Sequence, residues 1–332
     1  MSLSTGLPAA LFGGQAGSVP SPEGIPSGSV LSVLEFFGTT MPAQIIDGKA
    51  IAAEIRLEVK KNADELIKKH RITPGLAFIL VGDNPASQSY VGMKGRACAE
   101  AGFYSVTERL SKETPEKKLL EMIRGFNQDP KIHGILVQLP LPSQIREHLV
   151  IEAIDPKKDV DGFHPWNVGQ LVTGGKGFKP CTPAGIQQLL LRSGNDPGGK
   201  HVVVVGRSNI VGKPVANILF QKQMGANAIV TLVHTGAKDL RPYTKSADIL
   251  IAAMGCAESI TGEMLKEGVV VVDVGTNCVE DGSAKKGYRI VGDVHFESVS
   301  KIAKAITPVP GGVGPMTIAM LLSNTLEAAQ PS

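Results

Sequence analysis

The sequence predicts an α/β protein with two α/β domains, the second built on a doubly wound parallel sheet. Three observations lead to this fold class. The chain has 332 residues, 42% of them hydrophobic, which is enough for two domains of ordinary size. Segments with helical and strand-like patterns alternate, as in parallel sheets with crossover helices. The later strands are β-branched runs, which are typical of a sheet covered on both faces.

Residues 1–40 are expected to form a flexible tail without a catalytic role. The segment "GGQAGSVPSPEGIPSGS" has a Gly/Pro/Ser-rich composition that cannot offset its ordering entropy. No Lys or Arg precedes Lys49, which argues against a secretory signal and against an Arg-rich transit peptide. Met41 is therefore interpreted as the natural start of the fold.

The first domain is expected to span residues 41–180 together with a C-terminal helix over 315–330. Asp47 is placed to cap the helix over "GKAIAAEIRLEVKKNADELIKKH", where apolar residues recur at helical spacing. Three strands are then predicted, in "PGLAFILVG", "YSVTERL" and "IHGILVQLPLP". Between them lie two predicted helices, the first in "DNPASQSYVGMKGRACAEAG" and the second over residues 115–127. This alternation predicts a parallel sheet.

The second domain is expected to span residues 181–305. It opens with the helix of "CTPAGIQQLLLRSG", for which Thr182 is the predicted N-cap, Pro183 the first helical residue and Gly194 the residue just past the end. Five strand-like runs follow in "KHVVVVGRSNIVGKP", "AIVTLVH", "ADILIAAMG", "GVVVVDVG" and "YRIVGDV". We expect these runs to form the doubly wound sheet.

The charge balance and the cysteines exclude several classes of function. Lys and Arg number 34 against 31 Asp and Glu, so the net charge of +3 gives no reason to expect nucleic acid or an anionic membrane. No apolar run approaches the roughly 18 residues that span a bilayer. The cysteines are far apart, without a CxxC pair or nearby histidines, so we expect them to be reduced and predict no metal site.

The segment "VVVVGRSNIVGKP" is a candidate nucleotide loop between a buried strand and a helix. Backbone N–H groups at such a helix start suit a phosphate. Gly206 and Gly212 do not have GxGxxG spacing, so an ordinary strand-to-helix turn is the alternative. Arg207 suits the 2′-phosphate of NADP, and no acid stands at His234 and Thr235 to repel it. The loop therefore favours NADP over NAD.

Two further segments carry candidate catalytic groups. Tyr90 and Lys94 are four residues apart, so both project from one helix face, although such a pair is usually just a partly exposed surface. Gln138 and Asp161 stand near predicted strand ends, where open α/β sheets bind ligands. Near the C-terminus, "PVPGGVGPMT" predicts a shaped loop that admits a ligand to the backbone, or a plain hinge between domains.

A set of motifs in fixed order resembles the methylenetetrahydrofolate dehydrogenase/cyclohydrolase family. They are "SYVGMK", "GILVQLPLP", "KDVDGFHPWNVG", "CTPAGI", "GRSNIVGKP", "DVGTN", "GDV" and "PVPGGVGPMT", and the resemblance covers about Ala43 to Ala329. It implies a Rossmann-type dinucleotide-binding second domain, an active-site cleft between the domains, and a cytoplasmic homodimer. The implied activities are NADP-dependent oxidation of 5,10-methylenetetrahydrofolate to the methenyl cation and hydrolysis of that cation to 10-formyltetrahydrofolate.

The resemblance also implies the roles of individual residues. Lys94 matches the family's catalytic lysine, Tyr90 its neighbour over the folate, Gln138 the lysine's hydrogen-bonding partner and Asp161 the carboxylate that holds the pterin. The remaining implied folate contacts are Leu139, Pro310, Gly311 and Gly312. The implied cofactor contacts are Thr182, Gly206, Arg207, Ser208, Ile210, Val211, Gly212, His234, Thr235, Gly275, Thr276 and Asn277.

The chemistry assigns proton transfer to Lys94. Hydride removal requires that the folate is aligned with the nicotinamide. It needs little proton transfer, because the two nitrogens that flank the reacting carbon stabilise the cation. Hydrolysis needs a group that takes a proton from water, and a lysine does so only when partly neutral. Gln138 would orient the amine without holding its proton, as a carboxylate would.

Some features leave alternatives open. Val233 stands where the family often has a cysteine, which bears on the 2′-phosphate pocket. His164 and Trp166 either line the cleft or serve in capping and packing. One rival function is a dehydrogenase without useful cyclohydrolase activity. Another is a non-catalytic dinucleotide sensor, which would need the cofactor loop but neither Tyr90, Lys94 nor Asp161.

Overall fold

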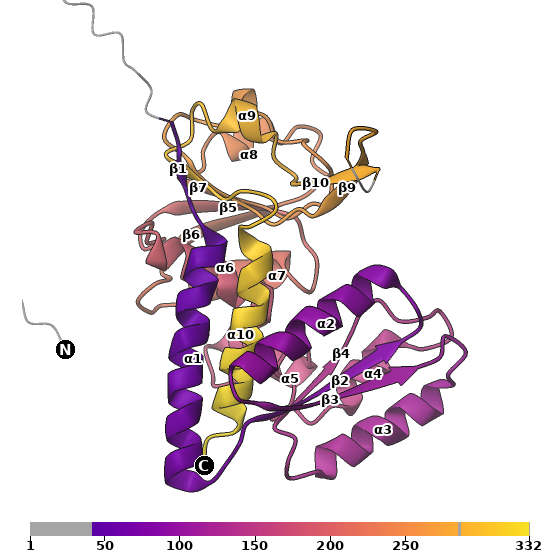
Figure 1. Cartoon of the computed structure of the whole chain (residues 1–332). Helices are drawn as coiled ribbons and strands as arrows, with labels where there is room; N and C mark the ends of the chain where they lie inside the picture. The colour runs from indigo at the N-terminus through magenta and orange to yellow at the C-terminus, as the bar shows by residue number, and fades with distance from the viewer. Residues whose placement is uncertain (1–41, 285–286, 332) are drawn as a thin grey trace, which may run out of the picture. The chain divides into compact units, whose positions relative to one another are not determined.

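The computed structural model describes residues 42–284 and 287–331 (Figure 1). The expected tail over residues 1–40 and the start of the fold at Met41 lie outside these described residues. Within the two described ranges, no helix is long and apolar enough to cross a membrane.

A parallel sheet with the strand order β3-β2-β4 is the centre of the first half of the chain. Its strands are β2 (Gly75–Val81), β3 (Tyr104–Leu110) and β4 (Gly134–Val137). The connecting helices are α2 (Pro85–Glu100) and α3 (Glu116–Gln128), and α4 (Glu147–Ala153) follows β4. Every residue of β2 is buried, because helices cover both faces of this central strand.

The second half of the chain contains a parallel sheet of order β1-β11-β8-β7-β5-β6. Its strands are β1 (Gln44–Ile45), β5 (His201–Val205), β6 (Ile229–Val233), β7 (Ile249–Ala252), β8 (Val270–Asp273) and β11 (Ala305–Ile306). Val202 and Val204 pack into one core cluster, whereas Val203 and Val205 pack into another. Both faces of the sheet are therefore covered, and the predicted fold class is confirmed.

Two strands lie elsewhere than the sequence predicted. The segment "YRIVGDV" was expected in the parallel sheet, but β10 (Tyr288–Val291) pairs antiparallel with β9 (Asn277–Glu280) as a separate ribbon. Three of the four residues of β10 are exposed, so this strand lacks the apolar faces of a central strand. β1 belongs by sequence to the predicted first domain, yet it pairs with β11 at the edge of the second sheet.

Three helices connect the two sheets. α1 (Gly48–His70), α6 (Cys181–Arg192) and α10 (Val313–Ala328) pack against one another, and α1 and α10 run side by side in Figure 1. α10 also contacts α2 and β4. One core cluster therefore contains residues of both sheets, such as Phe78 of β2 and Val204 of β5. The remaining helices are α5 (Pro165–Thr173), α7 (Gly212–Phe220), α8 (Arg241–Thr244), α9 (Phe296–Val299) and the 3₁₀ turn η1 (Gly262–Met264).

Of the two predicted N-caps, the structure has one, at Asp47, and lacks the other, at Thr182. Asp47 caps α1 as predicted, because its Oδ1 accepts from the N–H groups of Lys49 at 2.9 Å and Ala50 at 3.1 Å. The cap predicted at Thr182 is wrong, since α6 begins one residue earlier, after Pro180. The Thr182 hydroxyl instead pairs with that of Thr317 in α10 at 2.8 Å.

Candidate active site

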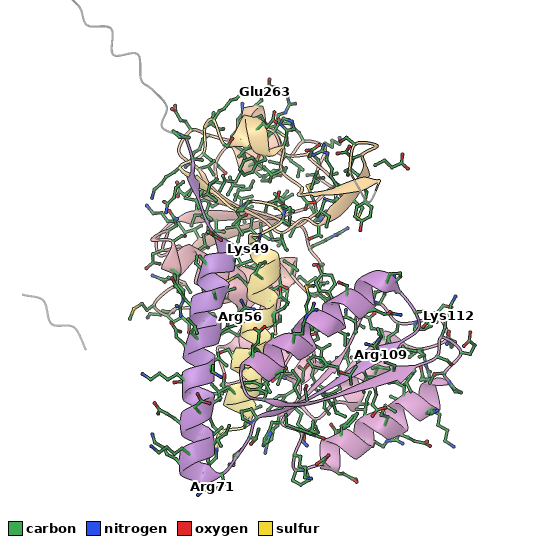
Figure 2. The ribbon with its side chains drawn as sticks, in the orientation of Figure 1. Lys49, Arg56, Arg71, Arg109, Lys112 and Glu263 are labelled. Carbon is green, nitrogen blue, oxygen red and sulfur yellow. The ribbon has the colours of Figure 1, made fainter. Side chains whose placement is uncertain are left out.

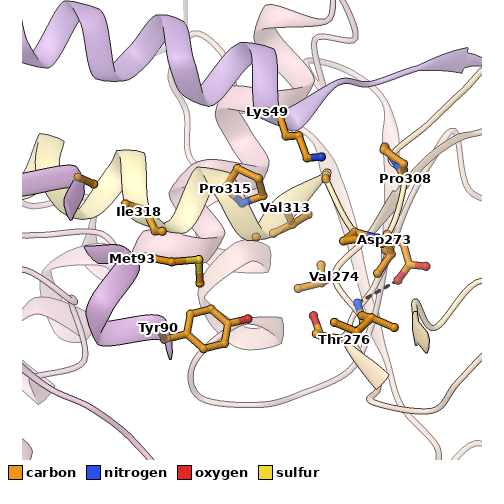
Figure 3. Close-up of a pocket in the computed structure, with 18 of the residues that line it drawn as sticks. Lys49, Tyr90, Met93, Asp273, Val274, Thr276, Pro308, Val313, Pro315 and Ile318 are labelled. Atoms are coloured by element: carbon orange, nitrogen blue, oxygen red, sulfur yellow. Dashed lines mark hydrogen bonds between the residues drawn. The ribbon is translucent and has the colours of Figure 1, made fainter. Parts of the chain in front are cut away.

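A pocket of about 480 Å³ opens between α1, α2, the carboxyl edge of the second sheet and the start of α10 (Figure 3). Tyr90 and Met93 enter it from α2, and Val274 and Thr276 line it from the loop after β8. Residues 308–315 form another wall, which includes the predicted contacts Pro310, Gly311 and Gly312. The structure thus brings the "PVPGGVGPMT" loop, Tyr90, Gly275 and Thr276 to one pocket.

The loop before α10 comes close to the start of α1. A Cβ atom on Gly48 would collide with the carbonyl oxygen of Gly312, so only glycine fits at the first position of α1. Gly311 has φ +114°, in the region that favours glycine. The loop's shape therefore depends on glycines on both sides of the contact.

Lys94 and Tyr90 share α2 but have different surroundings. Tyr90 is 41% exposed and lines the pocket, whereas Lys94 is 7% exposed and is not one of the residues that line it. The Lys94 Nζ donates a hydrogen bond to Gln138 Oε1 at 3.1 Å, and Gln138 Nε2 donates to the carbonyl of Leu139 at 2.8 Å. The second bond fixes which end of the Gln138 amide faces the lysine. The structure therefore brings three predicted folate contacts together.

Asp161 is half-buried and interacts electrostatically with Lys94. Burial raises the pKa of Asp161, while the charge of Lys94 and a hydrogen bond from Cys181 oppose the rise. The charge of Lys94 therefore acts on a carboxylate, in addition to the hydrogen bond that its amine donates to the neutral Gln138.

A buried aspartate, Asp159, supports the segment that carries Asp161. Asp159 accepts hydrogen bonds from the N–H groups of Phe163 and His164 and from Asn167 Nδ2, at 3.3, 2.8 and 2.8 Å. Burial is the main cause that raises its pKa to about 6. His164 caps α5, because its Nδ1 accepts from the N–H of Trp166 at 3.0 Å. Of the two alternatives for His164, the structure therefore shows the capping one.

The candidate nucleotide loop follows β5. Ser208 Oγ accepts from the N–H groups of Val211 at 3.1 Å and Gly212 at 3.3 Å, which holds the turn into α7. Gly206 has φ +134°, and a Cβ there would collide with the carbonyl oxygen of Ala253 after β7. Arg207 is exposed, and no described acid forms an ion pair with it.

Ile210 in the same loop points elsewhere. It lines a separate pocket of about 440 Å³ between α4, α5 and α7. The structure therefore does not bring this predicted cofactor contact to the pocket that contains Tyr90.

The end of β6 has no acid in the first five residues after the strand. His234 Nδ1 accepts from the N–H of Gly236 at 3.0 Å, and Thr235 is exposed. The first carboxylate, Asp239, forms an ion pair with Arg241 at 3.0 Å. A phosphate beside Arg207 and Thr235 would therefore meet no free acid from this strand end.

Two buried aspartates that sequence reasoning did not single out organise the remaining loops. Asp273 accepts from the N–H groups of Gly275, Asp293 and Val294, each within 3.0 Å. Asp293 accepts from the backbone of residues 254–256 and from Asn277 Nδ2 at 2.9 Å. Burial raises the pKa of Asp273 to about 6. The motifs "DVGTN" and "GDV" contain both aspartates, but local sequence does not reveal that they share one network.

Within residues 42–284 and 287–331, no group of three or more His, Cys, Asp or Glu side chains could hold a metal ion. Cys98, Cys181, Cys256 and Cys278 are free thiols. Burial raises the pKa of Cys98 to about 12, so this thiol stays protonated near neutral pH.

Two family models match the chain. One is described as "Tetrahydrofolate dehydrogenase/cyclohydrolase, catalytic domain" and matches residues 46–161. The other is described as "Tetrahydrofolate dehydrogenase/cyclohydrolase, NAD(P)-binding domain" and matches residues 180–332. Together they cover the strands of both sheets except β1, and they include Lys94 and the loop after β5.

Curated relatives and solved structures agree with these models. The "Bifunctional protein FolD" of Syntrophus aciditrophicus is 57% identical over 88% of this chain and 99% of the relative, and that of Moorella thermoacetica is 58% identical over 87% and 100%. The bifunctional FolD structure from Campylobacter jejuni is 50% identical with a TM-score of 0.81, covering 86% of this chain and 98% of that one. A Trypanosoma brucei FolD structure, complexed with NADP cofactor and inhibitor, is 39% identical with a TM-score of 0.82, covering 87% and 97%. The chain therefore belongs to the tetrahydrofolate dehydrogenase/cyclohydrolase family.

Proposed function

We propose that this chain oxidises 5,10-methylenetetrahydrofolate to 5,10-methenyltetrahydrofolate with NADP and then hydrolyses the product to 10-formyltetrahydrofolate. The observation that carries this proposal is the hydrogen bond from the buried Lys94 to Gln138, on the helix that also brings Tyr90 into the pocket. A dehydrogenase alone needs only the alignment of the folate with the nicotinamide. A positioned amine can also transfer the proton that hydrolysis requires.

The residues after β5 and β6 fit NADP. Arg207 is an exposed cation without an acid partner among the described residues, and the strand end at His234 and Thr235 offers no free carboxylate. This arrangement suits a 2′-phosphate. When bound, NADP supplies the hydride acceptor of the oxidation. We assign the phosphate contact to Arg207 and the support of the loop's shape to Ser208.

Asp161 is proposed to anchor the pterin. A carboxylate accepts hydrogen bonds from the ring N–H and amino groups of a pterin, and it is the ionised form that accepts them with both oxygens. Tyr90, exposed in the pocket, would then cover the folate from α2. These contacts hold the methylene carbon in place, which is what hydride removal requires.

Lys94 is proposed to transfer the proton in the hydrolysis. Water must lose a proton as it attacks the methenyl carbon, and a ring nitrogen must later gain one. Gln138 orients the amine through its oxygen. The cationic folate brings a positive charge to the lysine, which favours the neutral amine.

A coupled assay tests this function. The protein is mixed with methylenetetrahydrofolate and NADP, and NADPH is followed beside the appearance of 10-formyltetrahydrofolate. We expect both products. NADPH with methenyltetrahydrofolate decaying only at its uncatalysed rate would favour the dehydrogenase alone, and cofactor binding without either product would favour the sensor.

We also propose that the protein works as a cytoplasmic homodimer. The edge strand β6 exposes Ile229 and Leu232, which are 66% and 41% accessible, and an apolar strand edge is a ready site for pairing with another chain. Sedimentation should give twice the mass of one chain, and Leu232→Lys should shift it toward the monomer. A wild-type monomer at micromolar concentration would exclude the dimer.

A further inference from the structure

Two buried aspartates join three loops beside the carboxyl edge of the second sheet. Asp273 ends β8 and is 4% exposed, and Asp293 follows β10 and is fully buried. Asp273 Oδ1 accepts from the N–H groups of Gly275 and Asp293, both at 2.9 Å, and its Oδ2 accepts from that of Val294 at 3.0 Å. The Asp273 carboxylate therefore holds the loops after β8 and β10 together.

The Asp293 carboxylate binds the third loop, the one after β7. Its two oxygens accept from the N–H groups of residues 254–256 at 2.7 to 2.9 Å, and Oδ1 also accepts from Asn277 Nδ2 at 2.9 Å. Directly before this segment, the Ala253 carbonyl packs so closely against Gly206 that a Cβ atom there would collide with it. Gly206 opens the candidate nucleotide loop. The network thus extends from the nucleotide loop to the loop after β8.

This network supports one wall of the candidate active site. Val274, Gly275 and Thr276 line the pocket, and in Figure 3 Thr276 faces Tyr90 of α2 across it. Lys49, at the end of α1 that adjoins the second sheet (Figure 2), lines a further side. The aspartates therefore act on the side of the pocket opposite to α2.

Two glycines fit the loops closely around the carboxylates. A Cβ atom on Gly292 would collide with Asp273 Oδ2, and one on Gly275 would collide with the backbone nitrogen of Asp293. Because the segments pack without spare room, the loops cannot slide past one another. The two carboxylates therefore set the position of the pocket wall.

The two proposed reactions depend on this wall to different degrees. Hydride transfer requires aligned atoms about 3 to 3.5 Å apart, and a misplacement of about 1 Å can cost roughly a hundredfold in rate. Hydrolysis requires the folate and the Lys94 amine on α2, but no hydride acceptor. The wall over residues 308–312, which includes the implied folate contacts, adjoins Thr307, whose Oγ1 accepts from the backbone N–H of Asp273 at 2.8 Å. A change of either carboxylate leaves this backbone bond in place.

We propose that Asp273 and Asp293 are positioning residues for the oxidation. They hold Gly275, Thr276 and the loop after β7 at the separation that aligns the bound dinucleotide with the folate. They act through these loops, since each of their carboxylate oxygens already accepts a hydrogen bond from the protein. This inference rests on the proposed function, because it takes the dinucleotide and folate as the ligands of the pocket.

The test measures both activities in variants whose carboxylate becomes an amide. Asp293→Asn keeps the size, but whichever way the amide turns, two of the four donors meet an NH₂ group instead of an acceptor. We expect the dehydrogenase kcat to fall by about tenfold or more. The KM for folate and the cyclohydrolase rate should stay near wild type. Asp273→Asn can turn its NH₂ group toward Val294 alone, so it should lower the dehydrogenase kcat less.

Folding is controlled within the same experiment. Both activities are measured on one sample, so the ratio of dehydrogenase to cyclohydrolase activity does not depend on the fraction of folded protein. Asp248→Asn is the matched control at the amino edge of the same sheet, where Asp248 accepts from the N–H of His201 at 2.8 Å and pairs with Lys266 at 2.6 Å. This variant should keep the wild-type ratio.

The outcomes separate this inference from the proposed function. A ratio that falls in Asp293→Asn, falls less in Asp273→Asn and is unchanged in Asp248→Asn supports the positioning role. The milder Asp273→Asn keeps the test available if Asp293→Asn does not fold. A wild-type ratio in both variants, or an equal loss of both activities, would overturn the inference. Wild-type protein without dehydrogenase activity would contradict the proposed function and this inference with it.

Discussion

The Lys94 Nζ lies 3.1 Å from Gln138 Oε1, so an amine on α2 and an amide just after β4 meet inside the protein. The Gln138 amide is itself held by its bond to the Leu139 carbonyl. A neutral acceptor orients the amine, whereas an ionised acceptor would also hold its proton. The chemistry proposed for the site depends on this difference.

The first prediction concerns the Gln138 side chain. Gln138→Glu keeps the size but places a carboxylate beside Lys94, so we expect cyclohydrolase activity to fall by about tenfold or more because the lysine then retains its proton. Dehydrogenase activity should fall less. The measurement is methenyltetrahydrofolate decay at neutral pH, with NADPH formation as the parallel assay. Equal losses in both reactions would indicate a purely positional role for Gln138.

Replacing Asp161 tests the pterin anchor. Asp161→Ala should impair both reactions through weaker folate binding, while the affinity for NADP stays nearly unchanged. Because burial raises the pKa of Asp161, the wild-type carboxylate gains its proton at a higher pH than an exposed aspartate. The KM for folate should therefore rise in wild type as the pH is lowered into the acidic range, and the variant should lack this rise. Unchanged folate affinity in the variant would rule out the anchor.

Arg207 is predicted to determine the preference for NADP. Arg207→Ala should weaken the binding of NADP far more than that of NAD. The difference should be about 1.5 to 3 kcal/mol, the usual scale for a hydrogen bond to a charged group. The measurement is kcat/KM for both cofactors in wild type and variant. A matched control is Lys213→Ala, a cation on α7 whose Nζ bonds to Asn209. Similar losses for NADP and NAD would mean that Arg207 does not touch the 2′-phosphate.

The fold and the site could be predicted to different extents. The strands of both sheets could be predicted where apolar runs are long, as in "HVVVV", because burial on both faces leaves a strong local signal. β1 has two residues and gives no such signal, so its pairing with β11 depends on tertiary contacts. Thr182 shows the limit of cap rules, since its hydroxyl is used by Thr317 rather than by its own helix.

The contact between Lys94 and Gln138 could be predicted because both residues lie in motifs of the family resemblance. The network between Asp273 and Asp293 could not, since it joins segments twenty residues apart through backbone N–H groups.

Asp159 gives a prediction about stability. Its pKa is about 6 in the folded protein against 3.8 for an ordinary aspartate, so the folded state binds the proton more tightly than the unfolded chain does. This contribution, roughly 3 kcal/mol, is present below about pH 4 and is lost as the pH rises through about 6. Asp159→Asn should therefore show a smaller fall in unfolding free energy between pH 4 and 6.5.

Urea unfolding at several pH values measures this difference. Asp64→Asn, at an exposed position of α1, is the control and should keep the wild-type slope. Asp273 also has a pKa of about 6 and remains in the variant, so the slope should decrease without vanishing. An identical slope in wild type and Asp159→Asn would contradict the prediction.

The most direct test of the proposed mechanism is the separate measurement of the two activities in Lys94→Met. Methionine keeps much of the lysine's volume but removes the amine, so we expect cyclohydrolase activity to fall by roughly two orders of magnitude or more, the usual scale for a lost acid/base group. Dehydrogenase activity should fall less, because hydride transfer needs an aligned folate and no obligatory base. The assay supplies methenyltetrahydrofolate directly, follows its decay above the uncatalysed rate, and separately follows NADPH formed from methylenetetrahydrofolate. Hydrolysis at a near wild-type rate would contradict the assignment of proton transfer to Lys94.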